Sequence, residues 1–444
     1  MTVPPPDCRE RRGERVLLVW GAAPWWTVVD RQADRFIAAL VAGRSPAAAV
    51  AELTNGRADF SVARAAAEIV RRLKAAGVAR RRPRVPARDR LESVAVNVTN
   101  RCPLRCAFCY NQPEVHQPGA ELSGADLARA LDSLRRHFAP GALLALLGGE
   151  PLLRPDDTIE LARWGRRRGL RPLVSTNGLR VDERFARAAA GCGLEVQVSL
   201  DGPDAATHEA VRGEGTFDRA VAGVGLLLTA GVHTMISMVV HAGTLASIEA
   251  YLRLALSLGV AEARFLPVRR VGPGRRFTPP APLDLLRAIW RVADAEPELA
   301  ALLGRDYASI LAQTCHACAP RRSCGTGSQT LLLDADGTVY PCPNFVGPAF
   351  AAGNVRNERL DHLWRRAARL AEVREQTALS TRKPCATCWA RYWCLGGCAG
   401  ESYAEHGAFG HAGVGCDGLR EAVRETFWRL ADRPLAGGPA VARC

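Results

Sequence analysis

Hydrophobic and polar positions divide the N-terminal part of the chain into two apolar strands followed by three amphipathic helices. The expected strands are Val16–Trp20 and Trp25–Val29, with Gly21 and Pro24 between them. Apolar residues then recur at helical spacing in three stretches: Gln32–Val41, Pro46–Leu53 and Phe60–Ala76. This pattern predicts a small winged-helix-like α+β domain within residues 1–79.

Residues 93–310 alternate apolar strands with helical stretches such as Gly124–His137 and Leu245–Leu258. This alternation predicts a parallel sheet that curls into a partial (β/α)6 TIM-like barrel, an α/β fold with its chemistry at the carboxyl ends of the strands. The expected strands are Val94–Thr99, Leu143–Leu147, Pro172–Ser175, Glu195–Ser199, Thr234–Val239 and Ala263–Pro267.

Two further regions complete the predicted organisation. Residues 80–92 are rich in arginine and contain two prolines, so we expect a solvated basic linker. Residues 311–444 are rich in cysteine, and we expect a separate domain of short strands and turns there.

Composition narrows the function classes. The 444 residues carry a net charge of +14, with Lys74 and Lys383 as the only lysines. This charge is compatible with nucleic acid, but arginine and alanine enrichment throughout the chain favours coding bias, and an acidic peptide partner fits equally well. The chain has no apolar run of membrane-spanning length and no signal-peptide pattern, so we expect a cytoplasmic protein without a membrane partner.

Fifteen cysteines change this ordinary picture. A reducing cytosol disfavours disulfides, so clustered cysteines there indicate metal binding or redox chemistry. Most of them fall into two groups, one at Cys102–Cys109 and one between Cys318 and Cys416, whereas Cys8, Cys192 and Cys444 have no assigned role.

The first group, Cys102-x3-Cys106-x2-Cys109, directly follows the first barrel strand. Three thiolates can hold three irons of a [4Fe–4S] cluster and leave the fourth iron open to a chelating substrate. Structural zinc would require a fourth ligand, and the nearest histidine, His116, lies beyond the loop. The odd ligand count therefore favours the cluster.

This loop, with Phe108 before its last cysteine, resembles the radical S-adenosylmethionine (SAM) superfamily. The resemblance extends to Gly148-Gly149-Glu150-Pro151 after the second strand and to short polar motifs after the third and fourth. It implies that the three cysteines hold the catalytic cluster, that Glu150 and its backbone meet the SAM amino group, and that Arg212 approaches the carboxylate. The implied SAM contacts are Phe108, Gly148, Gly149, Glu150, Pro151, Ser175, Asn177, Ser199, Asp201 and Arg212.

The second cysteine group resembles the SPASM extension of radical SAM enzymes, which carries two auxiliary [4Fe–4S] clusters. The resemblance implies one ligand set of Cys318, Cys324, Cys342 and Cys398, and a second of Cys385, Cys388, Cys394 and Cys416. Cys315 could replace Cys318. A pair of zinc ribbons remains an alternative, because spacing alone does not choose the metal.

The N-terminal region resembles the PqqD-like recognition element, which binds the leader of a ribosomally made, modified peptide by adding a strand to its sheet. The whole order is similar to sactisynthase-like peptide maturases. It implies reductive SAM cleavage to a 5′-deoxyadenosyl radical, a thioether or carbon–carbon crosslink in a precursor peptide, and an electron donor such as flavodoxin or ferredoxin. Relatives that epimerise or decarboxylate peptides, or oxidise sulfatases, are alternatives. An iron–sulfur carrier or redox sensor and a zinc-bound DNA-binding protein are the rival classes.

Overall fold

The computed structural model describes residues 3–78, 90–111, 120–304 and 320–432. The predicted basic linker lies outside these ranges except for its last residues. Cys315, Cys318 and Cys444, and the histidine His116, lie outside them too.

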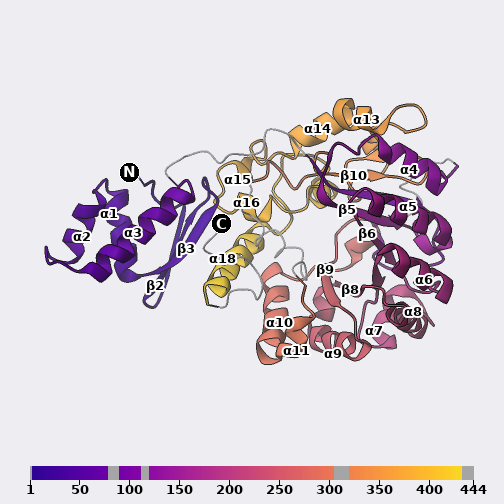
Figure 1. The fold of residues 1–444 in the computed structure, drawn as a ribbon, viewed down its shortest axis with the longest axis horizontal. Helices are drawn as coiled ribbons and strands as arrows, with labels where there is room; N and C mark the ends of the chain where they lie inside the picture. The colour runs from indigo at the N-terminus through magenta and orange to yellow at the C-terminus, as the bar shows by residue number, and fades with distance from the viewer. Residues whose placement is uncertain (1–2, 79–89, 112–119, 305–319, 433–444) are drawn as a thin grey trace.

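An eight-stranded sheet forms the larger part of the molecule, and six of its strands match the sequence prediction (Figure 1). Neighbouring strands from β10 through β4 to β9 run parallel, and only β11 is antiparallel. In sheet order the strands are β11 (Val339–Tyr340), β10 (Thr330–Leu333), β4 (Leu91–Thr99), β5 (Phe138–Gly148), β6 (Arg171–Thr176), β7 (Glu195–Ser199), β8 (Thr234–Val240) and β9 (Glu262–Pro267).

The predicted partial α/β barrel is confirmed, and the C-terminal region extends it by two strands. β4 begins at Leu91, so it takes in the last two residues of the predicted linker. Helices cover the outside of the sheet, and all of them except α7 share one apolar core with it (Figure 1). They are α4 (Gly124–Asp132), α5 (Pro155–Arg167), α6 (Glu183–Cys192), α7 (Ala205–Arg212), α8 (Phe217–Thr229), α9 (Ile248–Leu258), α10 (Pro282–Ala295) and α11 (Pro297–Ala301).

Two helix predictions in the barrel were too long. The predicted helix Gly124–His137 ends at Asp132, because the chain then makes successive turns and enters β5 at Phe138. The predicted helix Leu245–Leu258 begins as a 3₁₀ segment, Ala242–Ser247, and becomes α-helical from Ile248.

The C-terminal region is more helical than expected. Beside the short strands β10 and β11 it contains α13 (Leu360–Arg366), α14 (Ala368–Gln376), α15 (Lys383–Ala386), α16 (Arg391–Cys394), α17 (Ala399–His406) and α18 (Cys416–Asp432). Several of these are a single turn long, and cysteines lie within or at the start of α15 to α18.

The N-terminal region forms a three-stranded antiparallel sheet followed by three helices. Side chains of Asp30, Ser45 and Asp59 cap the helices in turn, which fixes where each begins. The elements are β1 (Cys8–Arg12), β2 (Arg15–Trp20), β3 (Trp25–Asp30), α1 (Arg31–Val41), α2 (Pro46–Leu53) and α3 (Phe60–Ala75). The sequence prediction missed β1.

This small sheet is buried on both faces. One face packs on the three helices through Val16, Leu18 and Trp20. The other packs on α16 and α18, which lie beside it in Figure 1, through Leu17, Val19 and Trp26. The Trp26 ring stacks on Phe427 with centroids 4.5 Å apart. The run Val16–Trp20 lacks polar alternation for this reason, since both of its faces meet apolar neighbours.

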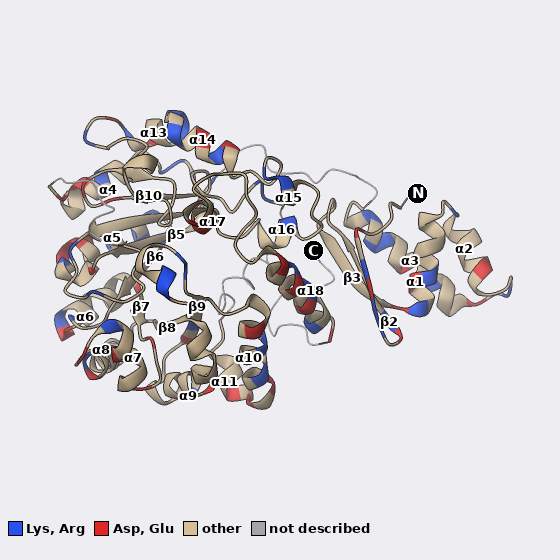
Figure 2. Cartoon of the chain, turned by 180° about the vertical axis from the view of Figure 1, so that it is seen from behind, with Lys and Arg blue, Asp and Glu red and all other residues tan. Residues whose placement is uncertain are grey.

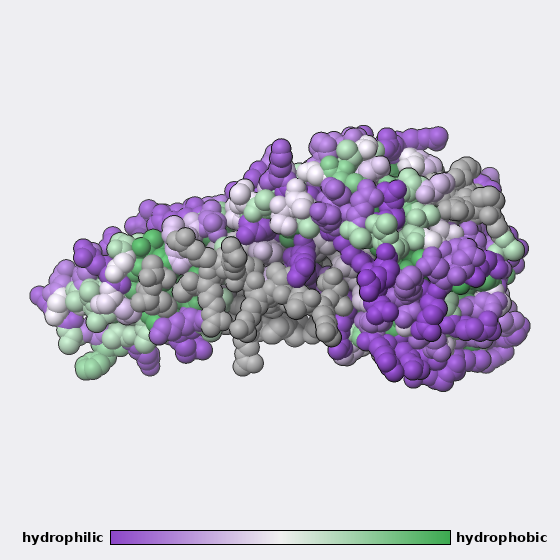
Figure 3. Space-filling view, turned by 90° about the horizontal axis from the view of Figure 1, so that it is seen from above, coloured by the Kyte–Doolittle hydropathy of each residue, from purple (hydrophilic) through white to green (hydrophobic). Residues whose placement is uncertain are grey.

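Charge is spread over the surface. Lysine and arginine alternate with aspartate and glutamate along the outer helices that Figure 2 displays. On the face seen in Figure 3, hydrophilic residues dominate the barrel part and hydrophobic ones form small groups. Among the described residues, no helix is long and apolar enough to cross a membrane.

Candidate active site and auxiliary cysteine sites

Two glycines at the end of β5 hold the start of the first cysteine loop. A Cβ at Gly148 would lie 2.1 Å from the Thr99 carbonyl oxygen, and one at Gly149 would lie 2.2 Å from that of Arg101. The Gly149 N–H donates to Thr99 at 2.7 Å, and the next N–H donates to Arg101 at 2.9 Å. Because only glycine allows this approach, the Gly-Gly pair fixes the loop against the sheet.

The three loop cysteines are half-buried, and none of the described cysteines forms a disulfide. Burial raises the pKa of Cys102 and raises that of Cys106 to about 11, while the charge of Arg212 opposes the shift. Neutral thiols of this kind become thiolates when a metal binds.

Glu150 links the ends of β5 and β6 from a position that is 1% exposed. Its carboxylate accepts the N–H of Leu152 at 2.9 Å, the hydroxyl of Thr176 at 2.7 Å and the N–H of Asn177 at 2.8 Å. Burial raises the pKa of Glu150, and these hydrogen bonds and Arg212 act against that rise. Glu150 therefore holds the ends of β5 and β6 together, and it is also a candidate SAM contact.

Asp201 fixes Arg212 from behind. One carboxylate oxygen of Asp201 accepts from Arg212 Nε, and the other accepts the N–H of Val239 at 2.6 Å. Burial and the Arg212 charge lower the pKa of His208 to about 4. Its Nδ1 accepts the Asp201 N–H at 3.0 Å.

A cavity of about 320 Å³ opens at the carboxyl ends of the strands. Arg212 projects into it, with Nη1 3.7 Å from Cys106 Sγ and the guanidinium 6.0 Å from the centre of the Phe108 ring. The predicted site residues that line it are Cys102, Cys106, Cys109, Phe108, Gly148, Gly149, Glu150, Ser175, Asn177, Ser199 and Arg212.

Two predicted SAM contacts do not line this cavity. Pro151 is buried at the start of a 3₁₀ turn, and Asp201 lies behind Arg212. The cavity also has lining residues that the sequence analysis missed, among them Ser237, Leu266, Arg269 and Asn344. The strand-end argument used for β4 to β7 would have found Leu266, which lies next to the last residue of β9, whereas Ser237 lies in the middle of β8. Asn344 comes from the C-terminal region and gave no such signal.

Three predicted auxiliary ligands, Cys324, Cys342 and Cys398, line a second cavity of about 590 Å³. It adjoins the first, since Arg269 and Asn344 line both. Asn344 Nδ2 donates to Cys398 Sγ at 3.3 Å. Burial raises the pKa of Cys342 to about 12, with added contributions from the two neighbouring thiols.

The other four predicted auxiliary ligands gather separately, around α15, α16 and the start of α18. Burial raises the pKa of Cys394 to about 12, and charges on Cys388, Cys385 and Cys416 raise it further. Cys324 of the first set packs against the cluster that contains Cys385 of the second, so the two sets are neighbours. The ligand assignment itself remains a prediction.

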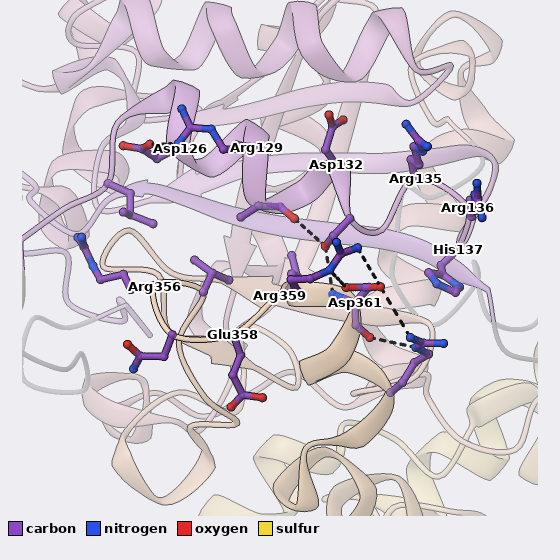
Figure 4. A pocket seen from close by; sticks show the side chains of 17 residues that line it. Asp126, Arg129, Asp132, Arg135, Arg136, His137, Arg356, Glu358, Arg359 and Asp361 are labelled. Carbon is purple, nitrogen blue, oxygen red and sulfur yellow. Dashed lines mark hydrogen bonds and ion pairs between the residues drawn. The ribbon is translucent and has the colours of Figure 1, made fainter.

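A larger groove of about 1190 Å³ between α4 and α13 has no cysteine in its lining (Figure 4). Its polar contacts converge on Asp361, which pairs with Arg359 at 3.0 Å and Arg365 at 3.8 Å and whose N–H donates to Ser133 Oγ at 3.1 Å. These charges are engaged with one another, so we place the chemistry at the cysteine-lined cavities.

Comparison with known proteins agrees with this placement. Residues 96–255 match the radical SAM superfamily, and residues 324–389 match the SPASM iron–sulfur cluster-binding domain. The chain is 31% identical over 313 residues to the mycofactocin maturase MftC of Mycobacterium tuberculosis, covering 68% of this chain and 76% of that protein. The chain belongs to the radical SAM superfamily.

This radical SAM enzyme is also similar to a curated relative and to a solved structure. It is 29% identical over 325 residues to the PqqA peptide cyclase of Gluconobacter oxydans, covering 70% of this chain and 86% of that protein. The structure of Streptococcus suis SuiB with bound S-adenosylmethionine matches with a TM-score of 0.60 at 15% identity, covering 93% and 99% of the two chains. SuiB has also been solved with its precursor peptide SuiA.

Membership of the radical SAM superfamily, with a SPASM domain, implies SAM and several [4Fe–4S] clusters as cofactors, and the residues fit them. Among the described residues no three histidine, cysteine or acidic side chains are close enough to share a single ion. A cubane instead binds each thiolate at a different iron. Cys102, Cys106 and Cys109 would hold one cluster beside the cavity that Arg212 enters, and the two C-terminal sets would hold the others.

Proposed function

We propose that this enzyme matures a ribosomally made precursor peptide by forming an intramolecular thioether or carbon–carbon crosslink. The observation that carries the proposal is the N-terminal sheet, which packs directly on α16 and α18, the helices that contain Cys394 and Cys416 of the second auxiliary set. A sheet of this kind can hold a peptide leader while the rest of that peptide reaches the cavities. The identity to a PqqA peptide cyclase supports the same class of substrate.

The N-terminal domain is proposed to be the PqqD-like recognition element, with the leader adding to the free edge of β3. In the described sheet β1 and β3 are the two edges. The sequence of β1 is Cys-Arg-Glu-Arg-Arg, and charges of this kind discourage strand addition. β3 has no charge before Asp30, so its backbone is the more receptive edge for main-chain pairing.

The barrel residues prepare the cavity for SAM. When bound, SAM and its cluster would supply a 5′-deoxyadenosyl radical, and the auxiliary clusters an acceptor for the electron left over from crosslinking. Arg212 is held by Asp201 so that its guanidinium can meet a carboxylate, and Glu150 keeps the Gly-Gly segment and Asn177 in register. Asp201 acts as a positioning residue, since both of its oxygens already accept hydrogen bonds.

Crosslinking removes two hydrogen atoms from the peptide. One is transferred to the adenosyl carbon, and the other leaves as a proton together with one electron. An external reductant must supply the electron that cleaves SAM, and a small acidic carrier such as flavodoxin or ferredoxin would be attracted to a chain of charge +14.

The test uses the full chain, anaerobically reconstituted and co-expressed with a short peptide encoded next to it. We expect 5′-deoxyadenosine in the presence of SAM and dithionite, and a peptide lighter by two hydrogen atoms per crosslink. The Cys106→Ala variant is the matched control and should give neither. An unchanged peptide mass with 5′-deoxyadenosine present would point to epimerisation, and no 5′-deoxyadenosine at all would favour an electron carrier.

A further inference from the structure

Arg382 is a buried cation without a described carboxylate partner. It lies just before α15 and is 2% exposed. Its Nε donates to the His411 carbonyl oxygen at 2.7 Å, but Nη1 and Nη2 are buried and make no hydrogen bond with any described residue. A guanidinium stays charged in a protein, so four N–H donors and a positive charge point into a space that the described residues leave unmatched.

A glycine keeps that space open toward the second auxiliary set. A Cβ at Gly396 would lie 2.6 Å from Arg382 Nη1 and 3.2 Å from Cys385 Sγ. The guanidinium and this thiol therefore lie on either side of the same glycine, and any side chain there would push one of them away.

The backbone at this glycine also joins the two cysteine sets. Leu395, Gly396 and Gly397 all have positive φ, at 50°, 73° and 71°. A left-handed leucine is uncommon, and this turn takes the chain from Cys394 of one set to Cys398 of the other. Arg382 thus lies against the turn that connects the sets.

Cysteines of both sets lie beside this turn. Cys385 of the second auxiliary set is buried in one cluster with Leu395, and Cys324 of the first set packs against that cluster.

We propose that Arg382 is a positioning residue shared by the two auxiliary clusters, with its Nη groups donating to thiolate or sulfide sulfurs on both sides. The proposal rests on the auxiliary ligand sets of the proposed function. Each cluster carries negative charge, so one fixed cation between them satisfies the buried guanidinium and stabilises the reduced state of both.

The test is a redox titration followed by electron paramagnetic resonance, using the full chain without SAM or peptide. Arg382→Gln should lower the midpoint potentials of both auxiliary clusters. We expect at least a tenfold change in the reduced-to-oxidised ratio at a fixed potential, which is about 59 mV for a one-electron couple. Lys383→Gln removes the same charge from the adjacent, exposed position and should change neither potential.

Unchanged potentials in Arg382→Gln, or a shift in only one cluster, would overturn the shared role. If that variant does not fold, Arg382→Lys decides, because it keeps the charge and loses the planar fork. Wild-type potentials in Arg382→Lys would then refute hydrogen bonding to both clusters, and a shift in both would support it. An iron content sufficient for fewer than three clusters in the wild type would instead refute the ligand sets themselves.

Discussion

The barrel and the C-terminal cysteine region each contain a buried arginine. The charge of the first is paired with a carboxylate, whereas no described carboxylate pairs with the second. In the barrel, Arg212 is paired with Asp201, which is itself held by Val239 and His208. In the C-terminal region, Arg382 has no partner for its Nη groups among the described residues. The arginine charge of the barrel site is therefore paired before any cofactor binds, whereas the auxiliary region leaves a charge for its clusters to balance. Cofactor binding should contribute little to folding of the first region and much to folding of the second.

Removal of iron should produce the largest difference between the two regions. Anaerobic treatment of the reconstituted protein with a chelator should expose backbone amides of α15 to α18 to hydrogen exchange, because several buried thiols and one buried cation lose their partners. Amides of β4 to β9 should keep their protection. Equal loss of protection in both regions would show that the barrel depends on its cluster as well.

Breaking the ion pair between Asp201 and Arg212 should destabilise the barrel, although removal of iron by the chelator should not. Asp201→Asn leaves Arg212 buried and unpaired, and we expect a loss of about 3 to 5 kcal/mol in the free energy of unfolding. Urea denaturation measures this loss. Asp156→Asn is the matched control, since its pair with Arg184 is exposed and should contribute at most about 1 kcal/mol. Similar losses in the two variants would contradict a preorganised Arg212.

The N-terminal sheet is expected to support the auxiliary region only. A Cβ at Gly21 would lie 2.5 Å from the Cα of Trp389, and Trp389 lies between Cys388 and Cys394 in the sequence. Gly21→Ala should therefore cost about 1 to 3 kcal/mol and broaden the spectrum of the second auxiliary cluster, while leaving the SAM-site cluster unchanged. Gly191→Ala, where a Cβ would meet nothing within 4 Å, is the control. A changed SAM-site spectrum in Gly21→Ala would show that the regions are coupled.

The sequence was most informative where residues act locally. Six barrel strands were found from apolar runs, and the glycines at positions 148 and 149 were found because their motif resembles a SAM-binding segment of the family. Their close approach to the cysteine loop was seen only in the structure. β1 was missed because its charged residues show no strand pattern; its pairing with β2 supplies the stability instead. Asn344 and Arg382 were missed because their roles depend on neighbours far along the chain, and a single asparagine or arginine gives no local signal.

The smallest effect is expected at the rim of the contact between the N-terminal sheet and the auxiliary region. Arg12 pairs with Glu425 of α18 and lies 4.8 Å from the centre of the Trp428 ring. The hydrogen bond from Arg12 lowers the pKa of Glu425 below 4.5. The stabilisation is thus fully present above pH 4.5 and is lost as the pH falls through the lowered value in the folded protein.

Arg12→Ala should cost at most about 1 kcal/mol in the free energy of unfolding near neutral pH, and less in acid. The control is Arg11→Ala, which removes only an exposed hydrogen bond to Gly13 and should show no such pH dependence. Urea denaturation near neutral pH and in acid measures the free energy of unfolding of each variant. If the cost of Arg12→Ala did not depend on pH, the contact would be assigned to stacking on Trp428 instead of to the ion pair.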